Sequence, residues 1–412
     1  MSKPLINITR GQAYAFACFL VLYEFLTYIS NDMIMPGMIQ VVHVFHAPES
    51  AISMSFTAYV LGGASLQLFL GPLSDCYGRR PVMLYGAFFF FICSFFIAVS
   101  NSIDQFMAAR FFQGMGLCFI CVVGYATLQE IFEEMDAIRL ISIMANVSVT
   151  APLIGPLLGA VFVQYFSWRI IFVVIGAFAL IAYWGLWRYM PEPVGQIKTD
   201  GEEIKPVPLS LRVIMGNYKN LLLNRSFMQS STALGLLGLP CCAWIALSPI
   251  ILVLDAKVSM VHYGLWQLPL FGAYIVGNVS LQWMTRRYSV KQLIWIGSSL
   301  TVSGGLLAYL LPLLFGGHFY GLMPGLLIYF FGYGLTGGPL NRFALYSTDV
   351  AKGTASAVIS ILTMLILALG IEVATVLNLA HSNYSFGLGC AITVIVYGLF
   401  LIDPRLRGGD SL

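Results

Sequence analysis

Long apolar runs separated by short polar segments make up most of the sequence. At roughly 20 residues or more, each is long enough to cross a membrane as a helix. The pattern therefore predicts twelve membrane helices. The runs lie at roughly 13–38, 52–73, 81–100, 105–127, 138–164, 168–190, 226–254, 262–285, 290–315, 319–347, 352–380 and 385–402.

One polar stretch between the sixth and seventh runs is much longer than the others. Residues 191–225 contain several prolines and charged side chains. We expect an N-terminal six-helix half at 1–190, a cytoplasmic linker at 191–225 and a C-terminal six-helix half at 226–412. Part of the linker, 209–222, is predicted to be a short helix at the membrane surface.

Composition supports the same class of protein. The chain is 59% hydrophobic and 9% charged, whereas soluble domains are about 25% charged. A mean hydropathy of +0.85 excludes a soluble protein with a single anchor. The net charge of +3 gives no reason to expect a nucleic-acid partner.

The positive charges set an expected orientation. If the N-terminus is cytoplasmic, most of the 21 Lys and Arg residues fall on the cytoplasmic side, as the positive-inside rule requires. Only Arg169 and Lys257 lie in outer loops, while Arg110 and Arg342 lie within apolar runs. Both termini are therefore predicted to be cytoplasmic.

The first apolar run contains two carboxylates, Glu24 and Asp32. Ionisable residues inside a membrane are costly and usually functional. At about 100° per residue, Glu24, Tyr28 and Asn31 share one helix face, with Asp32 at its edge. A carboxyl in a cavity can bind a proton from one side and release it to the other. The structural alternative is a permanent hydrogen bond or ion pair.

Arg110 in the fourth run cannot lose its charge, so it needs a partner or water. We expect a pairing with Asp32 or with nearby polar groups, and the alternative is a fixed structural arginine. Glu372 and Arg342 also lie in apolar runs, and their roles stay open. An acidic group after the fourth run is expected to be mainly a solvated cluster: Glu130, Glu133, Glu134 and Asp136.

Two further segments carry motifs. Residues 71–81 read Gly-Pro-Leu-Ser-Asp-Cys-Tyr-Gly-Arg-Arg-Pro. In the fifth run, Gly155 and Gly159 form a small face for close helix contact, and Pro152 and Pro156 loosen the helix. Cys118 and Cys121 have no further ligands nearby, so no metal and no cofactor is expected.

These motifs resemble those of the major facilitator superfamily. Residues 71–80 are similar to its loop between helices 2 and 3, and 151–159 resembles the antiporter motif of its drug:proton branch. Arg110-Phe-Phe-Gln-Gly matches that branch's R-x-x-Q-G. The sequence departs from the pattern at Cys76, where the family usually has arginine, and at Ala160, where it has glycine.

The resemblance implies a fold and three sets of residues. The fold would be an all-α membrane protein with the major facilitator fold, twelve transmembrane helices in two six-helix halves. The implied residues are, for proton coupling, Glu24, Asp32 and Arg110; for substrate binding, Tyr28, Asn31, Leu117, Tyr125, Met144 and Asn146; and for the conformational latch and motifs, Asp75, Gly78, Arg79, Pro152, Gly155, Pro156 and Gly159.

The function expected on this basis is proton-coupled antiport. The chain would export lipophilic, often cationic, drugs across the bacterial inner membrane by alternating access. We expect small molecules and protons as its ligands, the lipid bilayer as its surroundings, and a monomer. The alternatives are a dedicated exporter of one metabolite such as a siderophore or a sugar, a membrane-embedded enzyme, and a sensor without transport. No nucleophile–base pair favours the enzyme.

Overall fold

The computed structural model describes residues 4–198, 204, 211–350 and 352–401, and most of them are helical. The chain forms two compact units. One comprises residues 1–47 and 58–214, and the other comprises residues 48–57 and 215–412. Helix α3 (Ala51–Ser65) contributes residues to both units.

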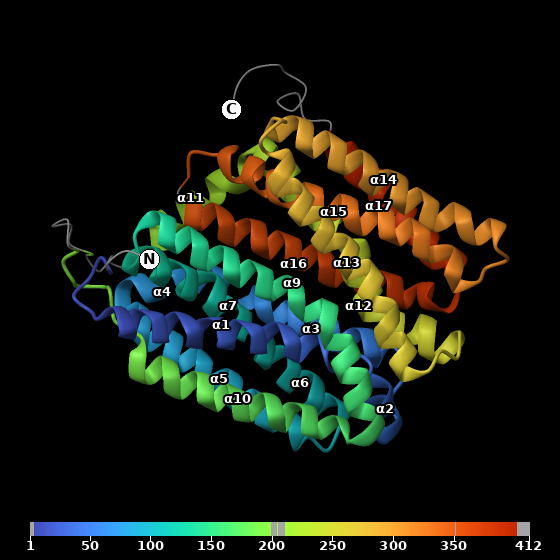
Figure 1. The fold of residues 1–412 in the computed structure, drawn as a ribbon, viewed down its shortest axis with the longest axis horizontal. Helices are drawn as coiled ribbons and strands as arrows, with labels where there is room; N and C mark the ends of the chain where they lie inside the picture. The colour runs from blue at the N-terminus through green and yellow to red at the C-terminus, as the bar shows by residue number, and fades with distance from the viewer. Residues whose placement is uncertain (1–3, 199–203, 205–210, 351, 402–412) are drawn as a thin grey trace. The chain divides into compact units, whose positions relative to one another are not determined.

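In the first unit α1 packs against α9 and α10, and α5 packs against α10 and α6 (Figure 1). The axes of these long helices are roughly aligned, and α10 runs antiparallel to α5. Besides part of α3, the helices of this unit are α1 (Arg10–Asp32), α2 (Met38–Val44), α4 (Gln67–Tyr77), α5 (Arg79–Ala98), α6 (Ile103–Gly114), α7 (Gly116–Cys118), the π-helix η1 (Phe119–Gly124), α8 (Tyr125–Ile131), α9 (Glu134–Tyr165) and α10 (Trp168–Tyr189).

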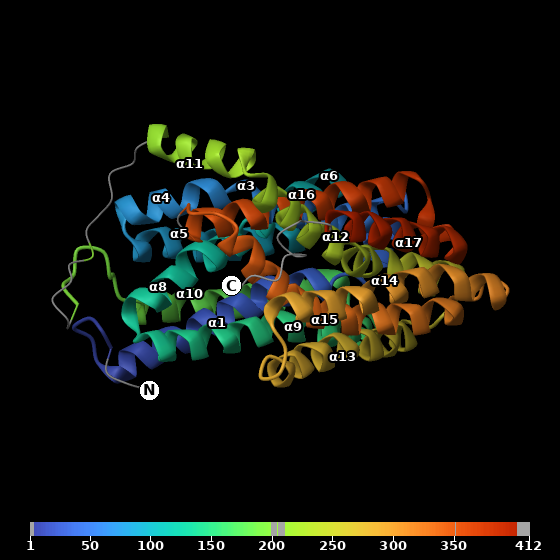
Figure 2. The same cartoon turned by 90° about the horizontal axis from the view of Figure 1, so that it is seen from above.

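In the second unit α15 packs against α13 and α14, and Figure 2 shows α15 between these two helices. α12 packs against α16 and α17. The helices assigned to it are α12 (Arg225–Ser248), the π-helix η2 (Pro249–Asp255), α13 (Met260–Met284), α14 (Val290–Leu314), the 3-10 helix η3 (Phe319–Gly321), α15 (Leu322–Tyr346), α16 (Lys352–Val376), the 3-10 helix η4 (Leu379–His381) and α17 (Asn383–Phe400).

The residues of α11 (Leu211–Leu223) are divided between the two units, with 211–214 in the first and 215–223 in the second. This helix covers most of the short helix predicted at 209–222, whose first two residues lie outside the described part. Its position at a membrane surface stays a prediction.

Polar side chains mark where the helices begin. The side chain of Thr9 accepts a hydrogen bond from the backbone of Gln12 at the start of α1, and Ser102 does the same for Gln105 at the start of α6. Such caps satisfy backbone N–H groups that have no partner within the helix. The apolar runs therefore become helices whose ends are set by local polar residues.

Each of the twelve predicted runs is mainly helical, and the all-α fold is confirmed. Among the described residues, ten helical segments are long and apolar enough to span a membrane, and the pair α3–α4, bent by 40°, makes an eleventh. The 25-residue helix α13 falls outside this set. It carries Gln267, Asn278 and Gln282, which lower its hydropathy.

Two glycines bring α9 very close to α1. A Cβ atom on Gly155 would lie 2.8 Å from Cβ of Asp32, and one on Gly159 would lie 1.9 Å from the carbonyl oxygen of Met33. No larger residue fits at this separation. Small residues allow such close approach between membrane helices, so this contact fixes α1 at the position of its second carboxylate.

We predict that Gly159→Ala destabilises the protein, because its methyl group overlaps the backbone of Met33. The cost should be about 1–3 kcal/mol, which is typical of overpacking. Gly272→Ala is the matched control, since nothing lies within 4 Å of a Cβ at that position of α13. Thermal unfolding in detergent should show a lower midpoint for Gly159→Ala only. Equal midpoints would contradict the close contact.

Candidate functional site

Arg110 is completely buried in α6 and makes hydrogen bonds to several groups. Its Nη2 donates to Oδ1 of Asn31 at 2.6 Å, and its Nη1 donates to Oε1 of Gln113 at 2.7 Å. The guanidinium also stands over the ring of Tyr59, with Cζ 4.6 Å from the centroid. A permanent charge is thus accommodated by amide oxygens and an aromatic face.

The hydrogen bonds continue on both sides of Arg110. Nδ2 of Asn31 lies 3.5 Å from Oδ1 of Asp32, at the limit of a hydrogen bond, and Nε2 of Gln113 donates to Oγ of Ser94 at 2.9 Å. All five side chains are buried. We call Asp32, Asn31, Arg110, Gln113 and Ser94 the arginine network. It joins α1, α5 and α6.

Asp32 belongs to none of the ion pairs found in the described part of the chain, although the residue is only 4% exposed. The amide of Asn31 lies between the two charged groups. The side-chain hydrogen bonds found for Arg110 go to polar groups, which are one of the two kinds of partner expected for it.

Glu24 occupies a separate position, two turns of α1 before Asp32. It is fully buried, and its Oε1 accepts a hydrogen bond of 2.7 Å from the hydroxyl of Tyr125. Its Oε2 is also buried and has no hydrogen-bond partner among the described residues. Buried polar atoms are rarely left in this condition. An ionised Oε2 lacks a donor and a protonated one lacks an acceptor, so the group is suited to exchanging a ligand or proton.

The other predicted substrate-binding residues differ in exposure. Leu117 in α7 and Met144 in α9 are buried, Tyr28 in α1 is half-buried, and Asn146 in α9 is exposed. All of them belong to the first unit. Their contact with a substrate stays a prediction.

A second polar cluster lies at the junction of α4 and α5. Nη1 of Arg79 is 2.5 Å from Oδ1 of Asp75, one turn earlier. The same guanidinium binds the carboxylate of Glu130 through Nε and Nη2, at distances from 2.7 to 3.3 Å. Arg79 is therefore held between carboxylates from two different helices. We call Asp75, Arg79 and Glu130 the arginine latch.

Glu192 positions the backbone beneath this latch. Its two carboxylate oxygens accept hydrogen bonds of 2.9 Å from the backbone N–H groups of Arg79 and Arg80. These N–H groups begin α5, where a carboxylate is favoured by the helix dipole. Gly78 adopts φ = 102° here, and a Cβ at this residue would lie 2.5 Å from Glu192.

One expectation from the sequence needs correction, and one contact was not predicted. Glu130 and Asp136 are not solvated: the Glu130 side chain is only 20% exposed and pairs with Arg79, and the Asp136 side chain is only 5% exposed and pairs with Arg139. Glu192, in the predicted linker, binds the start of a helix 112 residues earlier in the chain, which the sequence analysis did not predict. A carboxylate directly after the sixth run, between Pro191 and Pro193, was the available signal for Glu192.

The fourth span is also less regular than predicted. The run at 105–127 was predicted to be a single membrane helix. The structure contains the π-helix η1 between α7 and α8. Its wider turn changes the angle between residues before and after it.

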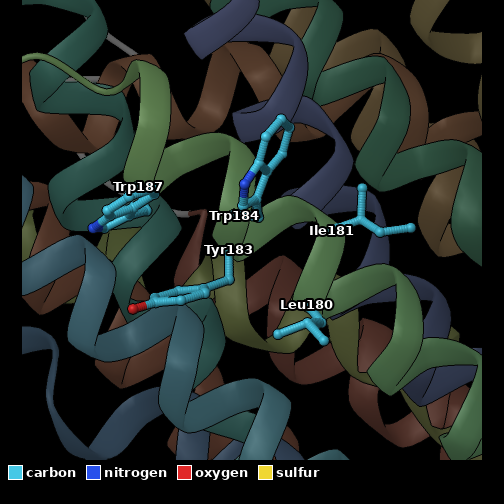
Figure 3. A pocket seen from close by; sticks show the side chains of 5 residues that line it. All are labelled: Leu180, Ile181, Tyr183, Trp184 and Trp187. Carbon is cyan, nitrogen blue, oxygen red and sulfur yellow. The ribbon is translucent and has the colours of Figure 1, made fainter.

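A cavity of about 540 Å³ lies on the face of α10, and none of the predicted site residues lines it (Figure 3). It is lined by Leu180, Ile181, Tyr183, Trp184 and Trp187, and the two tryptophans are about half exposed. Exposed aromatic side chains near a helix end are typical of the membrane–water interface. We therefore interpret this cavity as a lipid-facing groove.

The fold and the buried charges are those of a secondary transporter, and comparisons with known proteins agree. The sequence profile of the Major Facilitator Superfamily matches residues 20–371. Multidrug transporter MdfA of Yersinia pestis bv. Antiqua (strain Angola) is 44% identical over 404 residues, which cover 98% of this chain and 97% of that protein. Multidrug transporter MdfA of Escherichia coli O6:H1 is 44% identical over 399 residues, covering 96% and 95%.

Solved structures share the fold. The xylose transporter XylE from E. coli, in a partially occluded inward open conformation, has a TM-score of 0.72 at 15% identity and covers 98% of this chain and 100% of its own. The POT family transporter PepTSo has a TM-score of 0.71 at 12% identity, with 98% and 100% covered.

The chain belongs to the major facilitator superfamily. Within it, the chain is an MdfA-like member. It is a multi-pass membrane transport protein that acts on small molecules, and it is not an enzyme.

We predict that Glu130→Gln weakens the arginine latch. Losing a charged partner of a largely buried guanidinium should cost about 1–3 kcal/mol of folding free energy. Glu133→Gln is the matched control, because Glu133 is exposed and such changes are usually within about 0.5 kcal/mol. Thermal unfolding of both variants measures the difference. A midpoint for Glu130→Gln equal to that of the control would mean that the ion pair contributes nothing.

Proposed function

We propose that the chain exports lipophilic, often cationic, drugs or toxic compounds across the bacterial inner membrane in exchange for protons. The near full-length similarity to multidrug transporters supports the substrate class. The single observation that carries the coupling is Glu24, a fully buried carboxyl with one oxygen held by Tyr125 and the other without a partner.

The chemistry at Glu24 is an exchange of positive charges. An ionised carboxylate in a buried position is poorly solvated, so it gains from binding either a proton or a cationic substrate. The two cannot occupy the same oxygen together. If the proton is bound preferentially in one access state and the drug in the other, their affinities become linked.

Asp32 would act together with Arg110. The guanidinium keeps its charge, whereas the carboxyl gains or loses one through protonation. Asn31 contacts both groups: its Nδ2 faces Asp32 and its Oδ1 accepts from Arg110. A change in the protonation of Asp32 therefore changes the contacts of the amide that binds Arg110. This arrangement supports a role of the arginine network in converting proton binding into helix movement.

The arginine latch would favour one state of the cycle. With the N-terminus in the cytoplasm, the α4–α5 junction lies on the cytoplasmic side. Arg79 holds α5 to α4 through Asp75 and to α8 through Glu130. Breaking and remaking these pairs would accompany the alternation of halves 1–190 and 226–412, with 191–225 as their linker and a monomer as the working unit.

A variant with both first-helix carboxyls neutralised tests the coupling. We predict that Glu24→Gln combined with Asp32→Asn abolishes drug-dependent proton release from everted vesicles, because neither carboxyl of α1 remains to exchange its proton. The loss should be more than about tenfold. Asp104→Asn, in the exposed first turn of α6, is the control and should match the parent.

Drug resistance of cells that express each variant provides a second readout. The double variant should be as sensitive as cells without the transporter. The proposal fails if proton release and resistance both survive the double change while the protein level equals that of the parent.

A further inference from the structure

The fourth span, Ile103–Ile131, changes its hydrogen-bond pattern twice. Around Met115 the backbone pairs over three residues: the N–H of Met115 donates to the carbonyl of Phe112, and the N–H of Cys118 donates to the carbonyl of Met115. The π-helix η1 follows, and the N–H of Tyr125 bonds to the carbonyl of Ile120, five residues earlier. π-turns are rare within helices and are frequently found at functional sites.

η1 separates the two parts of the span that make functional contacts. Before it, α6 carries Arg110 of the arginine network. After it, α8 carries Tyr125, which binds Glu24, and Glu130, which belongs to the arginine latch. Any change in the geometry of η1 therefore acts on Tyr125 and Glu130 together and displaces both relative to Arg110.

The packing around η1 is tighter on its N-terminal side. A Cβ on Gly114 would lie 2.0 Å from the backbone oxygen of Tyr59, and Sγ of Cys118 is 2.9 Å from the carbonyl oxygen of Gly63. On the C-terminal side, a Cβ on Gly124 would meet the end of the Leu20 side chain at 3.2 Å. Backbone atoms hold one end in place, whereas a flexible side chain faces the other. Movement is therefore easier for α8 than for α6.

We propose that η1 is a conformational switch that couples Glu24 to the arginine latch. This inference rests on the proposed exchange of drug and proton at Glu24. When the pairing in η1 changes from i→i−5 to i→i−4, the following residues turn by about 100° and shift by about 1.5 Å along the axis. Tyr125 leaves Glu24 and Glu130 leaves Arg79 in the same movement, so the carboxyl is released as the latch opens.

The first test removes one residue from η1. Val122 is half-buried in η1. Deleting it removes the extra residue of the π-turn, so the segment pairs as an α-helix while Tyr125 and Glu130 keep their present directions. Without the extra residue, this segment cannot change between i→i−5 and i→i−4 pairing. Val122→Ala, which keeps the length of η1, is the matched control.

We expect the deletion variant to bind tetraphenylphosphonium, a lipophilic cation, within about twofold of the parent affinity, while its transport falls more than about tenfold. Val122→Ala should retain both properties. Transport by the deletion variant at the parent rate, with proton release intact, would overturn the proposal.

A second test does not depend on a deletion that folds. Tyr125→Phe and Glu130→Gln remove contacts with different helices, so independent sites would change tetraphenylphosphonium affinity additively. The switch predicts a non-additive change in the double variant, because both contacts respond to the same turn. Additive effects would refute it. Since Glu24→Gln combined with Asp32→Asn tests the exchange itself, a failure of the switch is distinguishable from a failure of the proposed function.

Discussion

The buried charge of Arg110 determines how several helices of the first unit are held together. A guanidinium cannot be neutralised by losing its proton, and inside a membrane helix it must find partners within the protein. Asn31 of α1 and Gln113 of its own helix supply oxygens, and Tyr59 of α3 supplies a ring face. Because an unpaired buried charge is very costly, these groups must stay together. The position of one side chain therefore ties α1, α3 and α6 to each other.

Close backbone contacts make these distances possible. Gly114 allows α6 to approach the backbone of Tyr59, and Gly155 with Gly159 allows α9 to approach α1 beside Asp32. Side chains of any size at these positions would push the helices apart and lengthen the hydrogen bonds of the arginine network. The glycines thus serve the polar contacts as well as the packing, and α1 is held firmly at Asp32.

The sequence predicted the parts of this arrangement that depend on local pattern. Apolar runs, the intramembrane charges Glu24, Asp32 and Arg110, and the loop at 71–81 are all visible along the chain, and the family follows from them. Pairings between distant residues were missed. Glu130 and Glu192 lie 51 and 112 residues from the groups they bind, and their charges look the same as those of solvated side chains. The π-turn was missed because the apolar composition of the run does not distinguish a local π-turn from a continuous α-helix.

The two carboxyls of α1 have different partners, and this difference favours a division of their tasks. Asp32 adjoins an amide whose oxygen is bound by a permanent cation, so a cationic drug approaching Asp32 also meets the charge of Arg110. Glu24 is bonded to the neutral hydroxyl of Tyr125 and presents a second oxygen without a partner among the described residues. Like charges repel strongly where water is excluded. Within the proposed exchange, Glu24 is therefore better placed to attract the cation, and Asp32 is better placed to change the contacts of Arg110 when its own charge changes.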